Sequence, residues 1–250
     1  MQKNKKPSSS SGAGLILYGR HPVMAALANP ERRISKLLCT AETAAELREP
    51  ASKRGISPLV VDRKELDRIL PREAVHQGFA LYCAPLPDYS IEEICTMADA
   101  LDKCHVLVLD QVTDPQNIGA IIRSCVAFNT LALIMQDKNS PAETGAMAKA
   151  SAGTIEHLPI CRVTNLSRAV KQLQEAGFWT VGMDGYADTT IDKMNKAGKT
   201  AIIMGSEGKG MRRLVEESCD STVRLPISDK VESLNVSTAA AIVLYEMNKE

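Results

Sequence analysis

The chain has 250 residues, of which 44% are hydrophobic, so it can bury the core of one large domain or of two modest ones. Its seven cysteines are scattered, with no CxxC pair and no histidine at zinc-finger spacing. This excludes a disulfide framework and a structural zinc site, and we expect no metal and a reducing, cytoplasmic compartment. The net charge is zero, but residues 1–86 carry +6 and residues 87–250 carry −6. The N-terminal part therefore suits contact with a phosphate backbone, although a solvated charged surface would give the same counts.

The two ends of the chain predict neither export nor membrane insertion. Residues 1–14 hold three lysines and a Ser/Gly stretch without the apolar run of a secretory signal, so we expect a disordered basic tail. The apolar run at residues 239–245 is far shorter than the roughly 20 residues that span a bilayer.

Residues 15–86 alternate short apolar runs with charged helical stretches, which is typical of a compact α/β unit. The apolar runs lie at residues 15–18, 34–39 and 59–61, and the helices at 22–29, 43–54 and 63–70. Residues 84–88 are proline-rich and break both periodicities, and a helix over 91–100 leads into the next strand. We therefore expect a first domain at residues 15–86, a linker at 87–100 and a second domain at 101–250.

Beyond this boundary, strands and helices alternate as in a mostly parallel α/β sheet. Strands are expected at residues 106–109, 131–135, 179–183, 201–204 and 222–225. Helices are expected at residues 116–128, 166–176, 211–218 and 234–247. Three segments of this second domain place polar side chains where these elements begin or end.

The first segment, residues 109–125, contains a helix start and an arginine that faces outward. Asp114 can cap exposed N–H groups, and Pro115 fits the first helical turn. Arg123 points roughly 150° away from the apolar stripe of this helix. That stripe consists of Ile118, Ile121, Ile122 and Cys125. Taken alone, Arg123 could be an ordinary solvated arginine.

The second segment, residues 204–211, is a glycine-rich turn between a buried strand and a helix. Its order, GxxGxG, is neither the GxxxxGK[ST] of a phosphate-binding loop nor the GxGxxG of a dinucleotide-binding turn. Glycines here permit positive φ and close approach of a ligand to the backbone. The same turn could also simply connect the strand to the helix.

In the third segment, residues 225–241, a strand ends in a polar loop and a small-residue helix begins. The helix starts at Ser233-Leu234-Asn235-Val236-Ser237, whose polar side chains can cap N–H groups. Taken alone, this pattern indicates a well-capped helix that packs closely through its alanines.

Together and in this order, the three segments resemble the signature motifs of the SpoU-type RNA 2'-O-methyltransferases of the SPOUT superfamily. The N-terminal residues 18–23 and 75–78 resemble the ribosomal-protein-like RNA-binding domain of one branch, which methylates a guanosine in large-subunit ribosomal RNA. The resemblance covers residues 15–248 and includes the stretches at 149–153, 156–159, 165–166 and 177–179.

The resemblance implies an α/β fold whose mostly parallel sheet carries a deep trefoil knot, preceded by a small α/β ribosomal-protein-like domain that binds RNA. It also implies a homodimer that completes the active site. The methyl donor would be S-adenosylmethionine, held by Met204, Gly205, Leu225, Pro226 and Leu234. This donor carries a sulfonium cation and no phosphate, so it needs backbone access rather than a phosphate cradle.

The same resemblance implies a catalytic set of Arg123, Asn117, Glu207, Ser233 and Asn235. Arg123 would grip a neighbouring phosphate and polarise the ribose hydroxyl; a role as proton acceptor stays open, because arginine is an unusual base. Asp229 stands where many relatives have glycine. Aspartate tolerates the left-handed backbone better than most residues, so the turn can survive.

The expected function is transfer of a methyl group from S-adenosylmethionine to a ribose 2'-hydroxyl in RNA. A guanosine of 23S ribosomal RNA is the favoured target, and transfer RNA is the alternative. A catalytically silent RNA-binding paralogue is a further alternative, against which the intact catalytic set argues. A Rossmann oxidoreductase is disfavoured, because its glycine spacing and its acidic ribose-binding residue are missing.

Overall fold

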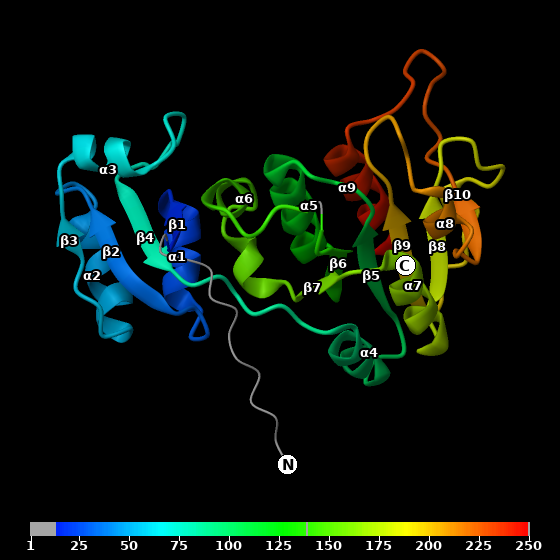
Figure 1. The fold of residues 1–250 in the computed structure, drawn as a ribbon, viewed down its shortest axis with the longest axis horizontal. Coiled ribbons are helices and arrows are strands. Elements are labelled where there is room, and N and C mark those ends of the chain that lie inside the picture. The colour runs from blue at the N-terminus through cyan, green and yellow to red at the C-terminus, as the bar shows by residue number, and fades with distance from the viewer. Residues whose placement is uncertain (1–13, 139, 250) are drawn as a thin grey trace.

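The computed structural model describes residues 14–138 and 140–249, so the expected basic tail lies outside the described residues except for Gly14. The described chain forms two sheets that lie side by side along the longest axis, each with its own helices (Figure 1). No described helix has the length and apolar character needed to cross a membrane.

The N-terminal domain is built on a four-stranded sheet in the order β1-β4-β2-β3. Its strands are β1 (Leu15–Tyr18), β2 (Ile34–Cys39), β3 (Leu59–Val60) and β4 (Phe79–Cys83). Its helices are α1 (Arg20–Ala28), α2 (Ala44–Lys53) and α3 (Arg63–Ile69). The expected apolar runs and helices are confirmed, but the central strand β4 was missed. It pairs antiparallel with both β1 and β2 and is almost wholly buried, so its sequence lacks the apolar-polar alternation of a half-exposed strand.

The C-terminal domain is built on a six-stranded parallel sheet in the order β10-β8-β9-β5-β6-β7. Its strands are β5 (Cys104–Leu109), β6 (Ala132–Gln136), β7 (Ile160–Val163), β8 (Trp179–Met183), β9 (Lys199–Met204) and β10 (Ser221–Val223). Its helices are α4 (Ile91–Asp99), α5 (Pro115–Ala127), α6 (Gly145–Ala150), α7 (Leu166–Glu175), α8 (Arg213–Glu216) and α9 (Val236–Met247). Two 3-10 turns complete it, η1 (Thr154–His157) and η2 (Ile191–Lys193).

The expected parallel α/β sheet is confirmed, with three differences in its elements. The edge strand β7 and the short helix α6 were not predicted. The helix expected at residues 211–218 is shorter than predicted, because α8 has only four residues. Helix α4 lies within the expected linker, but its buried Ile91, Ile94 and Ala98 pack into the core of the second domain. The limits of the linker at residues 87 and 100 stay predictions.

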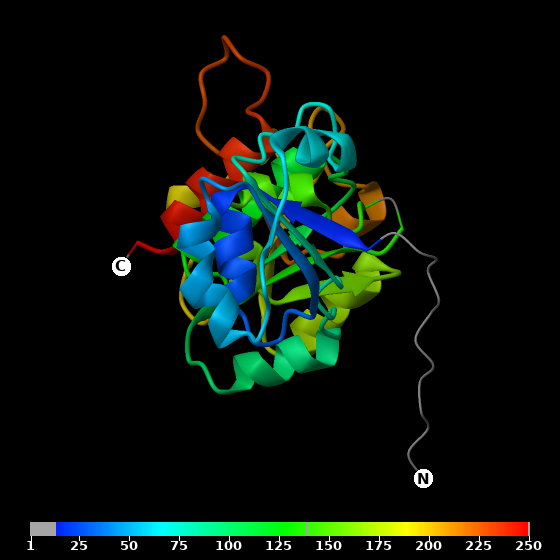
Figure 2. The same cartoon turned by 90° about the vertical axis from the view of Figure 1, so that its left-hand side faces the viewer.

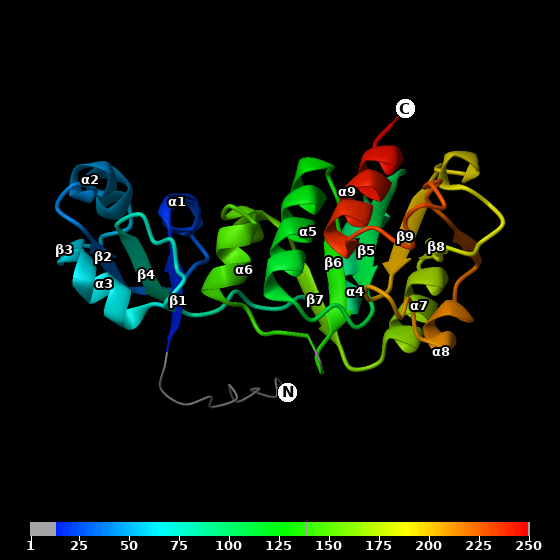
Figure 3. The same ribbon diagram turned by 90° about the horizontal axis from the view of Figure 1, so that it is seen from above.

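The central strands of the parallel sheet are buried on both faces. Leu107 and Leu109 of β5 point into a core shared with α5 and α9, and Val106 and Val108 point into a core shared with α4 and α7. Seen from above, α5 and α9 lie on one side of the sheet, with α7 and α8 on the other (Figure 3). The helix α4 and the loop that follows β10 lie at opposite ends of the molecule (Figure 2).

The two domains share a buried junction. The apolar core that contains Leu17 of β1 also contains Met147 of α6. Within the junction, the guanidinium of Arg32 is fully buried and lies 2.7 Å from carboxylate oxygens of both Glu143 and Glu156. Burial alone would lower the pKa of Arg32, but the hydrogen bonds that its guanidinium donates to Glu156 and Glu143 outweigh burial and raise the pKa, so the side chain stays charged. This ion cluster fixes the two domains relative to each other.

Candidate active site

The candidate site lies at the carboxyl edge of the parallel sheet, where the chain leaves β5, β9 and β10. In open α/β sheets, ligands bind at this edge. The backbone N–H of Asp110, directly after β5, donates to the carbonyl oxygen of Met204, the last residue of β9, at 2.8 Å. The first and second motif segments therefore begin at adjacent points of the sheet.

The first segment forms the helix start that its sequence predicts. Pro115 is the first residue of α5, and the side chain of Asp114 accepts hydrogen bonds from the backbone N–H groups of Gln116 and Asn117 at 3.1 and 3.3 Å. The predicted apolar stripe is buried, and Arg123 is exposed on the outer side of α5. Its guanidinium is therefore open to a ligand from solution.

The third segment meets the first through two asparagines. The side-chain oxygen of Asn235 caps α9 by accepting from the backbone N–H of Ser237 at 2.9 Å. Its Nδ2 donates to Oδ1 of Asn117 at 3.1 Å. Asn235 thus caps the free N–H groups at the start of α9 and also contacts α5. The contact brings together two candidate residues that are 118 positions apart in the sequence.

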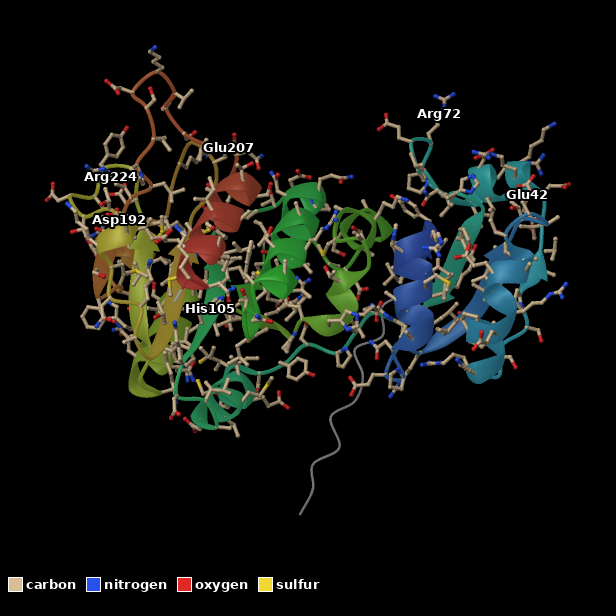
Figure 4. The ribbon with its side chains drawn as sticks, turned by 180° about the vertical axis from the view of Figure 1, so that it is seen from behind. Glu42, Arg72, His105, Asp192, Glu207 and Arg224 are labelled. Carbon is tan, nitrogen blue, oxygen red and sulfur yellow. The ribbon has the colours of Figure 1, made fainter. Side chains whose placement is uncertain are left out.

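The second segment is a closed turn that depends on its glycines. Ser206 and Gly210 exchange two backbone hydrogen bonds, of 3.1 and 2.9 Å. A Cβ atom on Gly205 would lie 2.0 Å from the carbonyl carbon of Gly210, so only glycine allows the two sides of the turn to approach this closely. Glu207 is exposed at the tip of the turn, at the upper edge of the molecule (Figure 4).

We predict that Gly205→Ala weakens binding of S-adenosylmethionine by about tenfold or more, since the added methyl group must push the turn open at a cost of about 1–3 kcal/mol. Isothermal titration calorimetry of the purified variant with this compound measures the effect. Gly185→Ala is the matched control, because a Cβ there meets nothing within 4 Å. Unchanged affinity in the Gly205 variant would contradict the role given to this turn.

One ion pair in the site was missed by the sequence analysis. Asp110 is fully buried, and its Oδ2 accepts from the backbone N–H of Arg212 at 2.8 Å while its Oδ1 accepts from Nε of the same residue at 2.8 Å. The pair ties the chain after the glycine turn to the end of β5. The sequence does contain a signal for this pair. A carboxylate directly after an apolar strand is expected to be buried, and a buried charge needs a partner.

The third loop is the most exposed part of the site. Residues 226–233 are exposed, including Pro226 and Ser233, while Leu225 and Leu234 are half-buried at its two ends. Asp229 does not have a positive φ, so the position does not use the left-handed backbone that glycine would favour. Aspartate is therefore accommodated at this position without any need for its tolerance of the left-handed backbone.

Of the ten candidate residues, Leu225, Pro226 and Leu234 lie on the third loop, between β10 and α9. Asn117 and Asn235 are in contact, and Met204 and Gly205 lie at the end of β9, where the backbone N–H of Asp110 donates to Met204. Glu207 and Ser233 are exposed on the two flanking loops, and Arg123 is exposed on α5. Within residues 14–138 and 140–249, no group of three or more His, Cys, Asp or Glu side chains is placed to hold a metal ion.

The fold is that of an α/β enzyme, and the three segments lie at the carboxyl edge of its parallel sheet, where ligands bind in open α/β folds. Residues 105–245 match the SpoU rRNA Methylase family, and residues 16–89 match the family described as RNA 2'-O ribose methyltransferase substrate binding. The chain therefore belongs to the SpoU family, and it is an RNA methyltransferase that depends on S-adenosylmethionine.

Individual relatives agree with this assignment. The chain is 35% identical over its whole length to an uncharacterized tRNA/rRNA methyltransferase of Mycobacterium sp. (strain KMS), covering 81% of that protein. It is also 35% identical to the 23S rRNA (guanosine-2'-O-)-methyltransferase RlmB of Escherichia coli, over 92% of this chain and 96% of that one. Among solved structures, the SpoU methyltransferase AviRb of Streptomyces viridochromogenes, crystallised with AdoMet, aligns over 94% of this chain and 89% of its own with a TM-score of 0.78. At 22% identity, this last likeness concerns the fold.

Proposed function

We propose that the protein transfers a methyl group from S-adenosylmethionine to a ribose 2'-hydroxyl of ribosomal RNA, with a guanosine of 23S RNA as the target. The observation that carries this proposal is the contact between Asn117 and Asn235, which joins the first and third motifs at the starts of α5 and α9. The similarity to the E. coli 23S rRNA methyltransferase over nearly both full chains supports the choice of substrate.

The residues at the carboxyl edge fit a donor that carries a sulfonium cation and no phosphate. Gly208 and Gly210 leave open space beside the backbone of the turn, and Leu225 and Leu234 offer half-buried apolar surface. We assign donor binding to Met204, Gly205, Leu225, Pro226 and Leu234. When bound, S-adenosylmethionine supplies an electrophilic methyl group; the protein's own task is to position and activate the ribose oxygen.

A neutral hydroxyl is a poor nucleophile, so its proton must be polarised or removed. Arg123 is exposed and its guanidinium presents planar donors, which suits a grip on a neighbouring phosphate and on the hydroxyl itself. We assign this role to Arg123, with acceptance of the proton as its second possible role. Asn117, Asn235, Glu207 and Ser233 act as polar partners that orient the ribose and the donor.

Transfer of label from S-adenosylmethionine to RNA tests the proposal. Purified protein is incubated with labelled donor and either 23S ribosomal RNA or transfer RNA, and 2'-O-methyl positions are then mapped. Label at a single guanosine of 23S RNA is expected. Label only in transfer RNA would replace the substrate, and donor binding without any transfer would indicate a silent RNA-binding paralogue.

We propose a homodimer formed through α9 and the neighbouring α5. On α9, Ile242 and Tyr245 are 42% and 54% exposed and lie on one face, three positions apart. Tyr245 packs edge-on against Phe128 at the end of α5, which extends this apolar face. Apolar faces of this kind on a folded domain mark interaction sites.

The expected effect of Ile242→Glu is a shift from dimer to monomer, because a carboxylate cannot be buried unpaired in an apolar interface. Size-exclusion chromatography with light scattering measures the mass. Leu214→Glu is the matched control, since Leu214 is 62% exposed on α8 on the other side of the sheet. A wild-type mass of one chain would contradict the proposal.

We also propose that the C-terminal segment is threaded as a trefoil knot. The backbone N–H of Arg224 donates to Thr189, its carbonyl oxygen accepts from Ile191, and its guanidinium contacts the carbonyl oxygens of Ala187 and Asp188. Lys196 then pairs with Glu246 of α9. The loop after β8 thus contacts both the chain that leaves β10 and helix α9, which supports the threading. We also place the enzyme in the cytoplasm, because its seven cysteines are unpaired, as is usual in a reducing compartment. We assign a ribosomal-protein-like fold to the N-terminal domain.

A further inference from the structure

A lysine of the catalytic domain is held at the junction by the RNA-binding domain. Lys149 is near the end of α6, and its Nζ donates to Oε1 of Gln77 at 2.7 Å. Gln77 belongs to the loop between α3 and β4. The same Oε1 also accepts from the backbone N–H of Arg20 at 3.2 Å.

The backbone around Lys149 is held in uncommon conformations. Gln77 has φ 56°, Gly78 has φ 83° and Gly19 has φ 88°. A Cβ on Gly19 would lie 2.4 Å from Nζ of Lys149, so the lysine occupies the space that a side chain there would need. His76, next to Gln77, is buried, and its Nε2 is hydrogen-bonded to Oδ1 of Asp67 at 3.0 Å. This contact anchors the loop. Strained positions persist where the surrounding structure holds them and concentrate at functional sites.

The ammonium group of Lys149 has a neutral partner and no anionic one. Among the described residues, no carboxylate forms an ion pair with it; the nearby Arg20 is paired with Glu46. Partial burial lowers the pKa of Lys149, because the charged form loses water without gaining a counter-charge. A fixed cation that is paired, within the described part of the chain, with an amide oxygen and no carboxylate is suited to receive an anion.

The position of Lys149 lies between the RNA-binding domain and Arg123. Helix α6 packs on α5 at Gly119, where a Cβ would lie 2.6 Å from the Cβ of Ala150. Gly119 and Arg123 are four residues apart and therefore on the same side of α5. Figure 3 shows α6 between α1 and α5, and Figure 4 places Arg72, of the same loop as Gln77, on the same edge of the molecule as Glu207.

We propose that Lys149 binds a phosphate of the RNA backbone on the path between the N-terminal domain and the target ribose. This inference rests on the proposed function and adds a positioning residue to it. The phosphate replaces Gln77 as the main partner of Nζ, so the lysine sets the register of the RNA relative to Arg123. A phosphate contact of this kind positions the strand and reads no base.

The test compares Lys149→Gln with wild-type enzyme in RNA binding and methyl transfer over a range of salt concentrations. Loss of one phosphate contact is expected to reduce the slope of log K against log salt by about 0.7–0.9. The KM for RNA should rise by about tenfold, as for a lost hydrogen bond to a charged group, while kcat at saturating RNA and the affinity for S-adenosylmethionine stay close to wild type. Lys149→Arg should restore most of the salt slope.

Two matched variants separate this role from a structural one. Lys103→Gln removes an exposed lysine just before β5, at the opposite edge of the sheet from the site, and should leave the slope and the KM unchanged. Gln77→Leu removes the partner of Lys149 but keeps its charge, so it should retain the wild-type slope. Equal losses in Lys149→Gln and Gln77→Leu, or a wild-type slope in Lys149→Gln, would overturn the inference. Both results require active wild-type enzyme; absence of methyl transfer by wild type would instead refute the proposed function.

Discussion

Arg123→Ala is expected to reduce methyl transfer to RNA by at least about a hundredfold, while the affinity for S-adenosylmethionine stays within about twofold of wild type. Arg123 is exposed on α5, whereas the stripe that holds this helix in the core lies on its other side. Alanine is a strong helix former, so α5 should persist. The variant should therefore lose the side chain to which we assign the RNA contact and keep the fold that we expect to bind the donor.

Labelled-donor transfer under single-turnover conditions and calorimetric donor binding measure the two effects. Arg168→Ala is the control, since Arg168 is an equally exposed helical arginine on α7, on the other face of the sheet. Arg123→Lys distinguishes phosphate binding from proton acceptance as the role of Arg123. Partial activity of this variant favours phosphate binding, because lysine can also bind a phosphate. Full turnover by Arg123→Ala would remove Arg123 from the catalytic set.

Arg32→Ala is expected to lower the free energy of unfolding by about 3–5 kcal/mol, because it leaves the buried carboxylates of Glu143 and Glu156 without their cation. The guanidinium also donates to the carbonyl oxygen of Ala84, at the entrance to the segment between the domains. The loss should therefore appear first as loosening of the two domains from each other.

Urea unfolding followed by far-ultraviolet circular dichroism measures this effect. The neighbouring Arg33 is exposed, so Arg33→Ala should change the stability by less than about 0.5 kcal/mol. A triple variant, Arg32→Met with Glu143→Gln and Glu156→Gln, should recover part of the loss, since it removes the unpaired charges as well. A loss below about 1 kcal/mol in Arg32→Ala would mean that water reaches the cluster.

Local sequence patterns predicted most of the helices and strands. The strand at residues 179–183 and the start of α5 at Pro115 follow from apolar runs and capping residues, and both are confirmed. Strand β7 was missed because it is four residues long and carries Arg162 in its middle, which breaks the apolar run. Strand β4 was missed because burial on both faces removes the alternation that marks a strand.

The site could be predicted only in part, for a physical reason. A sequence indicates which residues can cap or turn, but not which distant segments meet. The pairing of Asn117 with Asn235, the contact of Asp110 with Arg212 and the junction at Arg32 each join residues more than 100 positions apart. The motifs suggested the first of these through a family resemblance. The position of Asp110 directly after an apolar strand signals that it needs a buried partner, but no local pattern identifies Arg212 as that partner or joins Arg32 to Glu143 and Glu156.

One apolar core extends across both domains, and this limits how the domains can be exchanged between proteins. Side chains of β1, α6 and α5 belong to one core, so the N-terminal domain is not a detachable module. A chimaera that fuses this domain to the catalytic domain of another protein would have to include α6 and η1. Without them it would expose apolar surface and aggregate.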